Sequence, residues 1–155
     1  MKNNDKTSFF EELQEKMSKA EIEKIYKEMS TNIFTEKALL ETNAIKGAID
    51  AIKKISKKYD IYIITARIPQ LIVHVEKWLE KNNIKQYIKE VLSSFWVEKQ
   101  DICCQYNIDF LCSDDKRHLE KEKIDNRVLF NEFKHTNCTQ IKQVNSWKEI
   151  EKILL

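Results

Sequence analysis

The sequence predicts an α/β fold with a parallel β-sheet, and three observations point to it. Short apolar segments rich in β-branched and aromatic residues recur between segments of helical periodicity. The segment IYIIT at 61–65 is apolar on both faces, which is typical of an interior strand. Polar residues directly follow two of the strands. Strands that alternate with helices favour a parallel sheet with right-handed crossovers and helices on both faces.

The first part of the chain is expected to be helical. Helical periodicity runs from Thr7 to about Ser30 and divides near Ser18, where SKAE has the form of a capping box. Two interpretations of this region carry equal weight. Its apolar residues either form a small cap over a substrate site or simply cover the sheet. These residues are Phe9, Phe10, Leu13 and Met17.

The rest of the chain is expected to alternate between helices and strands. An amphipathic helix at about 44–57 precedes the strand at 61–65, and Pro69 suits the first turn of the next helix, which ends near 81–83. The remaining elements are a strand at 91–95, a helix at 99–106, strands at 108–112 and 127–130, and a terminal helix after Ser146, which forms a second capping box with Glu149.

Composition excludes several classes of function. The 155 residues suit one hydrophobic core, and the 27 basic and 25 acidic side chains alternate, so no nucleic-acid-binding stripe is indicated. No apolar segment is long enough for a bilayer or a secretory signal, so we expect no membrane partner and a cytoplasmic location. A single glycine, Gly47, excludes glycine-rich phosphate loops. Reduced thiols are expected at Cys103, Cys104, Cys112 and Cys138.

Two polar groups follow predicted strands and form the candidate site. They are Thr65-Ala66-Arg67 and Ser113-Asp114-Asp115, and Lys99 begins a helix between them in sequence. Ligands bind beyond the carboxyl ends of parallel strands, so these groups converge if their strands are close. Hydroxyl, ammonium and carboxylate together suit a phosphate held beside a divalent cation. Taken singly, each has an ordinary structural role in a turn or at a helix start.

In their order along the chain, these motifs resemble a known family. YDIYIITAR, WLEKNNI, Lys99, NIDFLCSDD and VNSWKEIEKIL are similar to the haloacid dehalogenase (HAD) superfamily, most closely its 5'(3')-deoxyribonucleotidase-like branch of bacterial and phage nucleotidases. The resemblance extends from about Met29 to the C-terminus. It implies a Rossmann-like three-layer sandwich with a helical cap remnant at 1–43 and a core at 44–155. It also implies a Mg²⁺-dependent hydrolase, a phosphatase acting on nucleoside monophosphates.

The resemblance also implies roles for the candidate residues. Thr65, with its neighbours Ala66 and Arg67, corresponds to the motif that binds the phosphoryl group. Lys99 corresponds to the lysine that contacts phosphate and takes part in catalysis. Asp114 or Asp115 corresponds to the acidic motif that ligates Mg²⁺, and the sequence leaves open which of the two is the ligand.

One departure from the family is severe. The family begins with a strand that ends in Asp-x-Asp, whose first aspartate is the nucleophile, and no such motif occurs here. We therefore expect an inactive homologue, either truncated or degenerate, that binds Mg²⁺ weakly or not at all. The missing strand is the central one in the family. The strands ending at Thr65 and Asp114 are expected either to pair directly or to have another segment between them.

Alternatives to a nucleotidase homologue stay open. The chain could be a non-catalytic domain that binds a small phosphorylated ligand or another protein, or it could assemble with a second copy or another chain that donates the absent strand. No catalytic role is expected for His74, His118 or His135, and we expect His118 to be an exposed helical residue.

Overall fold

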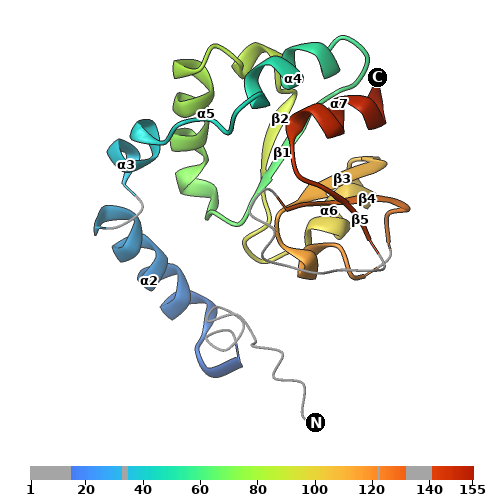
Figure 1. The fold of residues 1–155 in the computed structure, drawn as a ribbon. Helices are drawn as coiled ribbons and strands as arrows, with labels where there is room; N and C mark the ends of the chain where they lie inside the picture. The colour runs from blue at the N-terminus through green and yellow to red at the C-terminus, as the bar shows by residue number, and fades with distance from the viewer. Residues whose placement is uncertain (1–14, 33–34, 122, 132–140) are drawn as a thin grey trace. The chain divides into compact units, whose positions relative to one another are not determined.

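The computed structural model describes residues 15–32, 35–121, 123–131 and 141–155, and it divides the chain into two units, Met1–Glu41 and Thr42–Leu155 (Figure 1). The first unit contains α2 (Lys19–Asn32) and α3 (Glu36–Glu41). The capping box before α2 is confirmed, since the Ser18 N–H donates to Glu21 Oε2 at 2.9 Å and the Ser18 hydroxyl oxygen accepts from the Glu21 N–H at 3.4 Å. Phe9, Phe10 and Leu13 lie outside the described residues.

The sequence analysis did not predict helix α3. The Thr35 hydroxyl accepts a hydrogen bond from the Ala38 N–H at 3.1 Å, which satisfies one donor in the first turn. None of the six residues of α3 is buried. A helix this short and exposed leaves little apolar periodicity for a sequence pattern to detect.

The second unit confirms the α/β class. Strands and helices alternate through it, with 3₁₀ turns between them. The four predicted strands and the helix predicted at 99–106 start within about two residues of their predicted positions, whereas the helix predicted from about 44 starts about four residues later. The elements are α4 (Ala48–Ile55), β1 (Tyr62–Thr65), η1 (Pro69–Leu71), α5 (Ile72–Lys81), η2 (Lys85–Tyr87), β2 (Glu90–Ser93), α6 (Lys99–Gln105), β3 (Phe110–Ser113), η3 (Lys116–His118), β4 (Asn126–Phe130), β5 (Lys142–Val144) and α7 (Trp147–Leu154).

The strands form two parallel sheets. β1 pairs with β2, placing Thr65 opposite Ser93, and β3 pairs with β4, which in turn pairs with β5. Strand β5 was not predicted, because its three residues KQV carry too little apolar pattern. The alternative in which the strands ending near Thr65 and Asp114 pair directly is wrong, and no other described segment pairs with the facing edges of β1 and β3.

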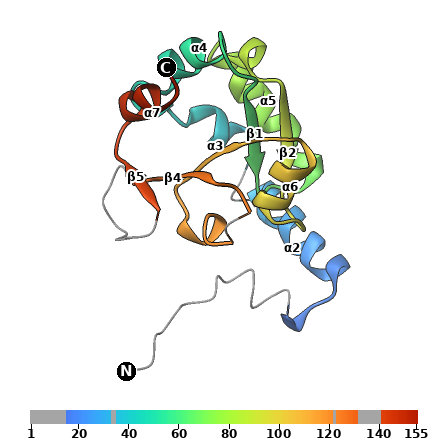
Figure 2. The ribbon, with the colours of Figure 1, turned by 90° about the vertical axis from the view of Figure 1, so that its right-hand side faces the viewer.

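Helices cover both faces of the β3–β5 sheet. On one face, Cys112 and Val128 pack with Ala51 and Ile55 of α4 and with Ile150 of α7. α4 and α7 lie side by side (Figure 2). On the other face, residues of β3 and β4 pack with α6 and with the segment after β3. The members of that second cluster are Cys103, Leu111, Leu119, Ile124, Leu129 and Ile141.

Two helices end in the same turn without glycine. Asn83 and Asn107 both have φ of 53°, in the left-handed region that asparagine tolerates. After α5, the Asn83 N–H donates to Glu80 O at 2.9 Å and the Ile84 N–H donates to Leu79 O at 3.0 Å. This pair of bonds is a Schellman motif, and α6 ends in the same way at Asn107. An asparagine therefore takes the place of the usual glycine after each helix.

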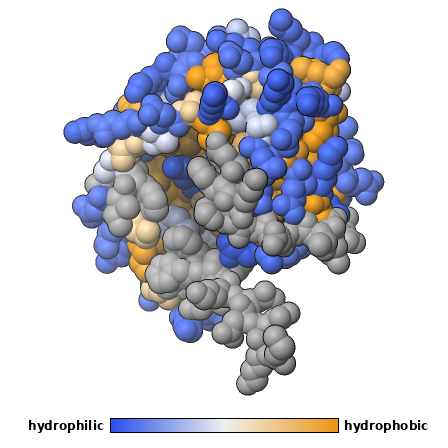
Figure 3. Space-filling model, in the orientation of Figure 1, coloured by the Kyte–Doolittle hydropathy of each residue, from blue (hydrophilic) through white to orange (hydrophobic). Residues whose placement is uncertain are grey.

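The face of the molecule drawn in Figure 3 is largely polar where its residues are described. Figure 3 shows hydrophilic residues over most of the described surface in view, with apolar residues between them in smaller areas. None of the described helices combines the length and the apolar character that a bilayer crossing needs.

Candidate functional site

The carboxyl end of β1 forms a hydrogen-bonded turn with the end of β2. The Thr65 hydroxyl is half-buried and accepts from the Arg67 N–H at 3.3 Å and from its guanidinium Nη1 at 3.4 Å. The Ser93 hydroxyl donates to the Arg67 carbonyl at 2.7 Å. The structure thus places Thr65, Ala66 and Arg67 together, with Ala66 exposed. The O–H hydrogen of Thr65 has no acceptor among the described residues and is available to a ligand oxygen.

Lys99 is the first residue of α6 and the half-buried cation of the site. Its ammonium forms no hydrogen bond or ion pair with any residue that the structure describes. Burial lowers the pKa of Lys99, and the nearby carboxylates of Asp114 and Asp115 oppose that shift. Partial burial of a cation without a hydrogen-bonding partner is unfavourable, so this amine is a candidate for contact with an anion.

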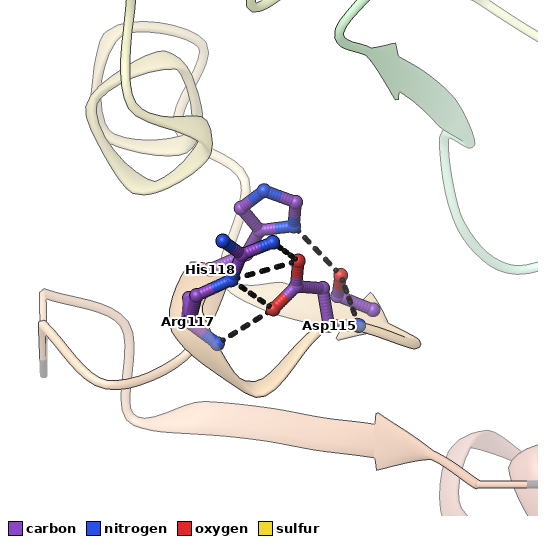
Figure 4. A network of polar contacts seen from close by, with 4 residues as sticks. Asp115, Arg117 and His118 are labelled. Carbon is purple, nitrogen blue, oxygen red and sulfur yellow. Dashed lines mark hydrogen bonds and ion pairs between the residues drawn. The ribbon is translucent and has the colours of Figure 1, made fainter. Parts of the chain in front are cut away.

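The two aspartates after β3 differ in their surroundings. Both Asp115 oxygens bond to Arg117: Oδ1 accepts from the backbone N–H at 3.0 Å and Oδ2 accepts from Nη2 at 2.5 Å. Figure 4 shows Asp115 facing Arg117, with His118 beside them. These hydrogen bonds lower the pKa of Asp115. Asp114 is exposed and makes no hydrogen bond or ion pair with a described residue, so its carboxylate is the freer of the two.

His118 differs from the exposed helical residue that the sequence led us to expect. It is half-buried, and its Nδ1 lies 3.1 Å from the hydroxyl of the buried Ser113. Burial, followed by the charge of Lys99, lowers the pKa of His118. The expectation failed because η3 turns the chain back onto α6, and sequence periodicity contains no signal for that turn.

Gln100 is a site residue that the sequence analysis missed. Its side chain is 1% exposed. Its amide nitrogen donates to the His118 carbonyl at 3.0 Å, and its amide oxygen accepts from the Lys123 N–H at 2.7 Å. Because Gln100 follows Lys99 directly, these two bonds position the Lys99 backbone against the segment that carries Asp114 and Asp115. Its only sequence signal is a polar residue on the apolar face of an amphipathic helix.

The ligands available for a metal are few. Within the described residues, no group of three or more histidine, cysteine or acidic side chains is placed to hold a metal ion. Asp114 and Asp115 alone remain, and Asp115 is engaged by Arg117. Burial raises the pKa of Cys103 to about 11 and that of Cys112 to about 12, so neither thiol is ready to act as a thiolate. Cys138 lies outside the described residues.

A cavity of about 1200 Å³ separates β1 from β3. Ile63 and Ile64 line it from β1, Leu111 and Cys112 line it from β3, and Lys99 lies in its wall. The candidate residues thus form two groups, Thr65 to Arg67 on one sheet and Lys99 with Asp114 and Asp115 by the other. No hydrogen bond between described residues joins the two groups. No protein-family model, curated protein or solved structure matches this chain.

Proposed function

We propose that this chain binds a small phosphate monoester, such as a nucleoside monophosphate, and does not hydrolyse it. In this proposal it is a non-catalytic homologue of the HAD nucleotidases, with a three-layer core that lacks its central strand. The observation that carries the proposal is the Lys99 ammonium, which is half-buried and has no hydrogen-bonding partner in the described structure. An anionic ligand would satisfy its charge and return its pKa toward the ordinary value.

The other residues supply contacts of complementary kinds. The Thr65 hydroxyl can donate to a phosphoryl oxygen, and the Arg67 guanidinium at the same turn is a second cation. Ala66 is exposed at this turn, and its own side chain is only a methyl group. Asp114 can share a Mg²⁺ ion with the phosphate, as magnesium sites commonly combine few carboxylates with substrate oxygens. Such a site would be weak without further carboxylates.

Hydrolysis is not part of the proposal because the described site lacks an activated nucleophile. Asp115 is held by Arg117. Asp114 is exposed, and the Thr65 hydroxyl accepts its hydrogen bonds from Arg67, with no base among its described partners. A covalent route needs a nucleophile beside a base or with a suitably altered pKa. The sequence gives no Asp-x-Asp motif that would add one.

Calorimetric titration tests the proposal. Wild-type protein is titrated with inorganic phosphate and with deoxythymidine monophosphate, with and without Mg²⁺. We expect saturable binding that Lys99→Gln weakens at least about tenfold, equivalent to about 1.4 kcal/mol. Lys85→Gln is the matched control, because the Lys85 side chain is 42% exposed and its ammonium pairs with Glu80 at 2.7 Å. The proposal would be refuted if neither inorganic phosphate nor deoxythymidine monophosphate bound to the wild-type protein.

A turnover assay tests the non-catalytic part separately. We expect no release of phosphate from p-nitrophenyl phosphate or deoxythymidine monophosphate above the rate of buffer. Mg²⁺-dependent hydrolysis that disappears in Asp114→Asn would show that the chain is an enzyme after all.

A further inference from the structure

The charged residues of the cavity between β1 and β3 are unevenly placed. Seven of them line its space of about 1200 Å³, among the residues that the structure describes. Six of the seven lie within two residues of the first residue of a strand. Three of these six are acidic and three are basic, so the charges at the amino ends of the strands balance. The six residues are Asp60, Lys89, Asp109, Asp125, Arg127 and Lys142.

Lys99 is the seventh charged residue, and it lies toward the carboxyl ends of the strands. It begins α6, which follows the carboxyl end of β2. The carboxylates of Asp114 and Asp115, which follow the carboxyl end of β3, act on its ammonium. Neither aspartate lines the cavity. On this side, the described lining therefore contains one cation and no acidic residue, which favours a ligand with an anionic group at Lys99.

The rest of the described lining carries no charge. Ile52 and Ile55 line the cavity from α4, Leu79 from α5, and Ile63 and Leu111 from the strands. No described lining residue of α4, α5 or α7 is acidic or basic. The part of a ligand beyond its anionic group would therefore contact mainly apolar side chains. Burial of apolar surface favours a hydrocarbon in that position.

The size of the cavity fits a chain of carbon atoms attached to the anion. Small-molecule pockets typically have volumes of roughly 300–1,000 Å³, so a phosphate group alone would leave most of this cavity empty. Strand β1 has four residues and is about 13 Å long. An extended chain of about ten carbon atoms has a similar length.

A nucleoside fits this lining less well than a hydrocarbon chain. Its hydroxyl groups and base edges need hydrogen-bonding partners, and leaving them unpaired in a buried site is costly. Beyond the first residues of β1 and β3, the lining side chains of these strands are apolar or weakly polar. They are Ile63, Ile64, Leu111 and Cys112. Along these two strands, only backbone groups would remain as partners for a nucleoside.

We propose that the phosphate monoester bound at Lys99 is the ester of a long apolar alcohol, whose hydrocarbon chain occupies the cavity between β1 and β3. This ligand class rests on the phosphate binding proposed above and adds the chemical nature of the esterified group. The phosphate contacts the Lys99 ammonium, and the chain extends along β1 and β3 toward their amino ends.

Calorimetric titration with a series of alkyl phosphates tests this ligand class. The probes are methyl, hexyl and decyl phosphate, at concentrations at which each ester is monomeric. We expect the affinity to rise at least about tenfold at each step of the series, because each added CH₂ group is buried in the cavity. Lys99→Gln should weaken all three esters by a similar factor. 1-Decanol, which has the same chain without phosphate, should bind at least about tenfold more weakly than decyl phosphate.

A variant in the cavity wall separates the chain from the phosphate group. Ile63→Gln places a polar side chain of similar size in the lining. We expect it to weaken decyl phosphate at least about fivefold and to leave the affinity for methyl phosphate unchanged, which also shows that the variant is folded. Val73→Gln is the matched control, because Val73 is 45% exposed on α5 and does not line the cavity.

The outcomes of these titrations are distinct. Equal affinities along the series, all weakened by Lys99→Gln, would overturn the apolar ester and leave phosphate binding in place. No binding of any ester or of inorganic phosphate would refute phosphate binding itself. Tighter binding of deoxythymidine monophosphate than of decyl phosphate would assign the cavity to a nucleoside and overturn the hydrocarbon chain. Equal binding of 1-decanol and decyl phosphate would also overturn the proposal, because an apolar filler would then suffice.

Discussion

The Gln100 side-chain oxygen accepts a hydrogen bond at 2.7 Å from the backbone N–H of Lys123, a residue 23 positions later in the chain. The same side chain donates to the His118 carbonyl at 3.0 Å. The two bonds join the start of α6 to the segment after β3. They hold the residues that flank Lys99 against those that follow Asp114 and Asp115, so the second half of the candidate site depends on one buried amide.

Replacing Gln100 should therefore be costly. In Gln100→Ala, the Lys123 N–H and the His118 carbonyl lose their partner in a region where the amide side chain is 1% exposed. We expect a loss of about 1–3 kcal/mol in the free energy of unfolding, measured by urea denaturation. Gln105→Ala is the control, because Gln105 is exposed in the same helix. Equal losses in both variants would show that the two hydrogen bonds do not position the segment.

Gly47 is the single glycine of the chain, and its backbone requires one. Its φ is +83° at the N-cap of α4, a left-handed conformation that side chains disfavour. An added Cβ would lie 3.7 Å from Trp147 Cβ, which is ordinary contact, so the cost is conformational. We expect Gly47→Ala to lower the free energy of unfolding by about 1–2 kcal/mol. This loss should appear as a lower midpoint of thermal unfolding. Gly47→Asn should cost less, and a larger loss for asparagine would contradict this explanation.

Helix α5 offers a matched pair for its buried and exposed faces. Leu79 is 1% exposed and Val73 is 45% exposed. Leu79→Ala should cost about 2–5 kcal/mol, from lost burial and the cavity left behind. Val73→Ala should change stability by at most about 0.5 kcal/mol. Chemical denaturation of both variants checks the assignment of faces, which would be wrong if the two losses were similar.

The stability of the protein should decrease in mildly acidic solution because of His118. Burial lowers its folded-state pKa below the ordinary 6.5. As pH falls below about 6.5, the unfolded chain therefore takes up the proton first, and stability decreases until the folded-state pKa is passed. In His118→Gln, the loss of stability between about pH 7.5 and about pH 5.5 should be smaller than in wild type. The same loss in wild type and variant would exclude His118 as its source, and His74→Gln is the control on α5.

The sequence predicted the elements with strong periodicity and missed those without it. Helices α4, α5, α6 and α7 and strands β1 to β4 were predicted with shifted ends. α3 and β5 were not, because an exposed helix of six residues and a strand of three carry too little apolar pattern. The division of the strands into two sheets could not be read from local sequence either, because strand pairing depends on contacts between distant segments.

The candidate site was predictable as residue types but not as contacts. Ligands generally bind beyond the carboxyl ends of parallel strands, and this rule selected the polar residues after β1 and β3 as candidates. The contacts depend on the directions of side chains within short turns. Arg67 bonds to Thr65 in one turn, and in the other Arg117 bonds to Asp115 and not to Asp114. The sequence pattern had left the choice between the two aspartates open, and their different contacts leave Asp114 as the freer carboxylate. Gln100 was missed because its structural role depends on hydrogen bonds to His118 and Lys123, which lie far from it in the sequence.

The turn at Asn107 also limits which changes in chain length the protein can accept. It ends α6 at a fixed point, three residues before β3 begins at Phe110. Leu111 then packs toward α6, and Phe110 and Cys112 pack toward α4 and α7. Removing or inserting one residue between Asn107 and Phe110 would exchange these faces along the whole strand. We therefore expect related chains to vary in the length of their surface connections elsewhere and to keep this interval constant.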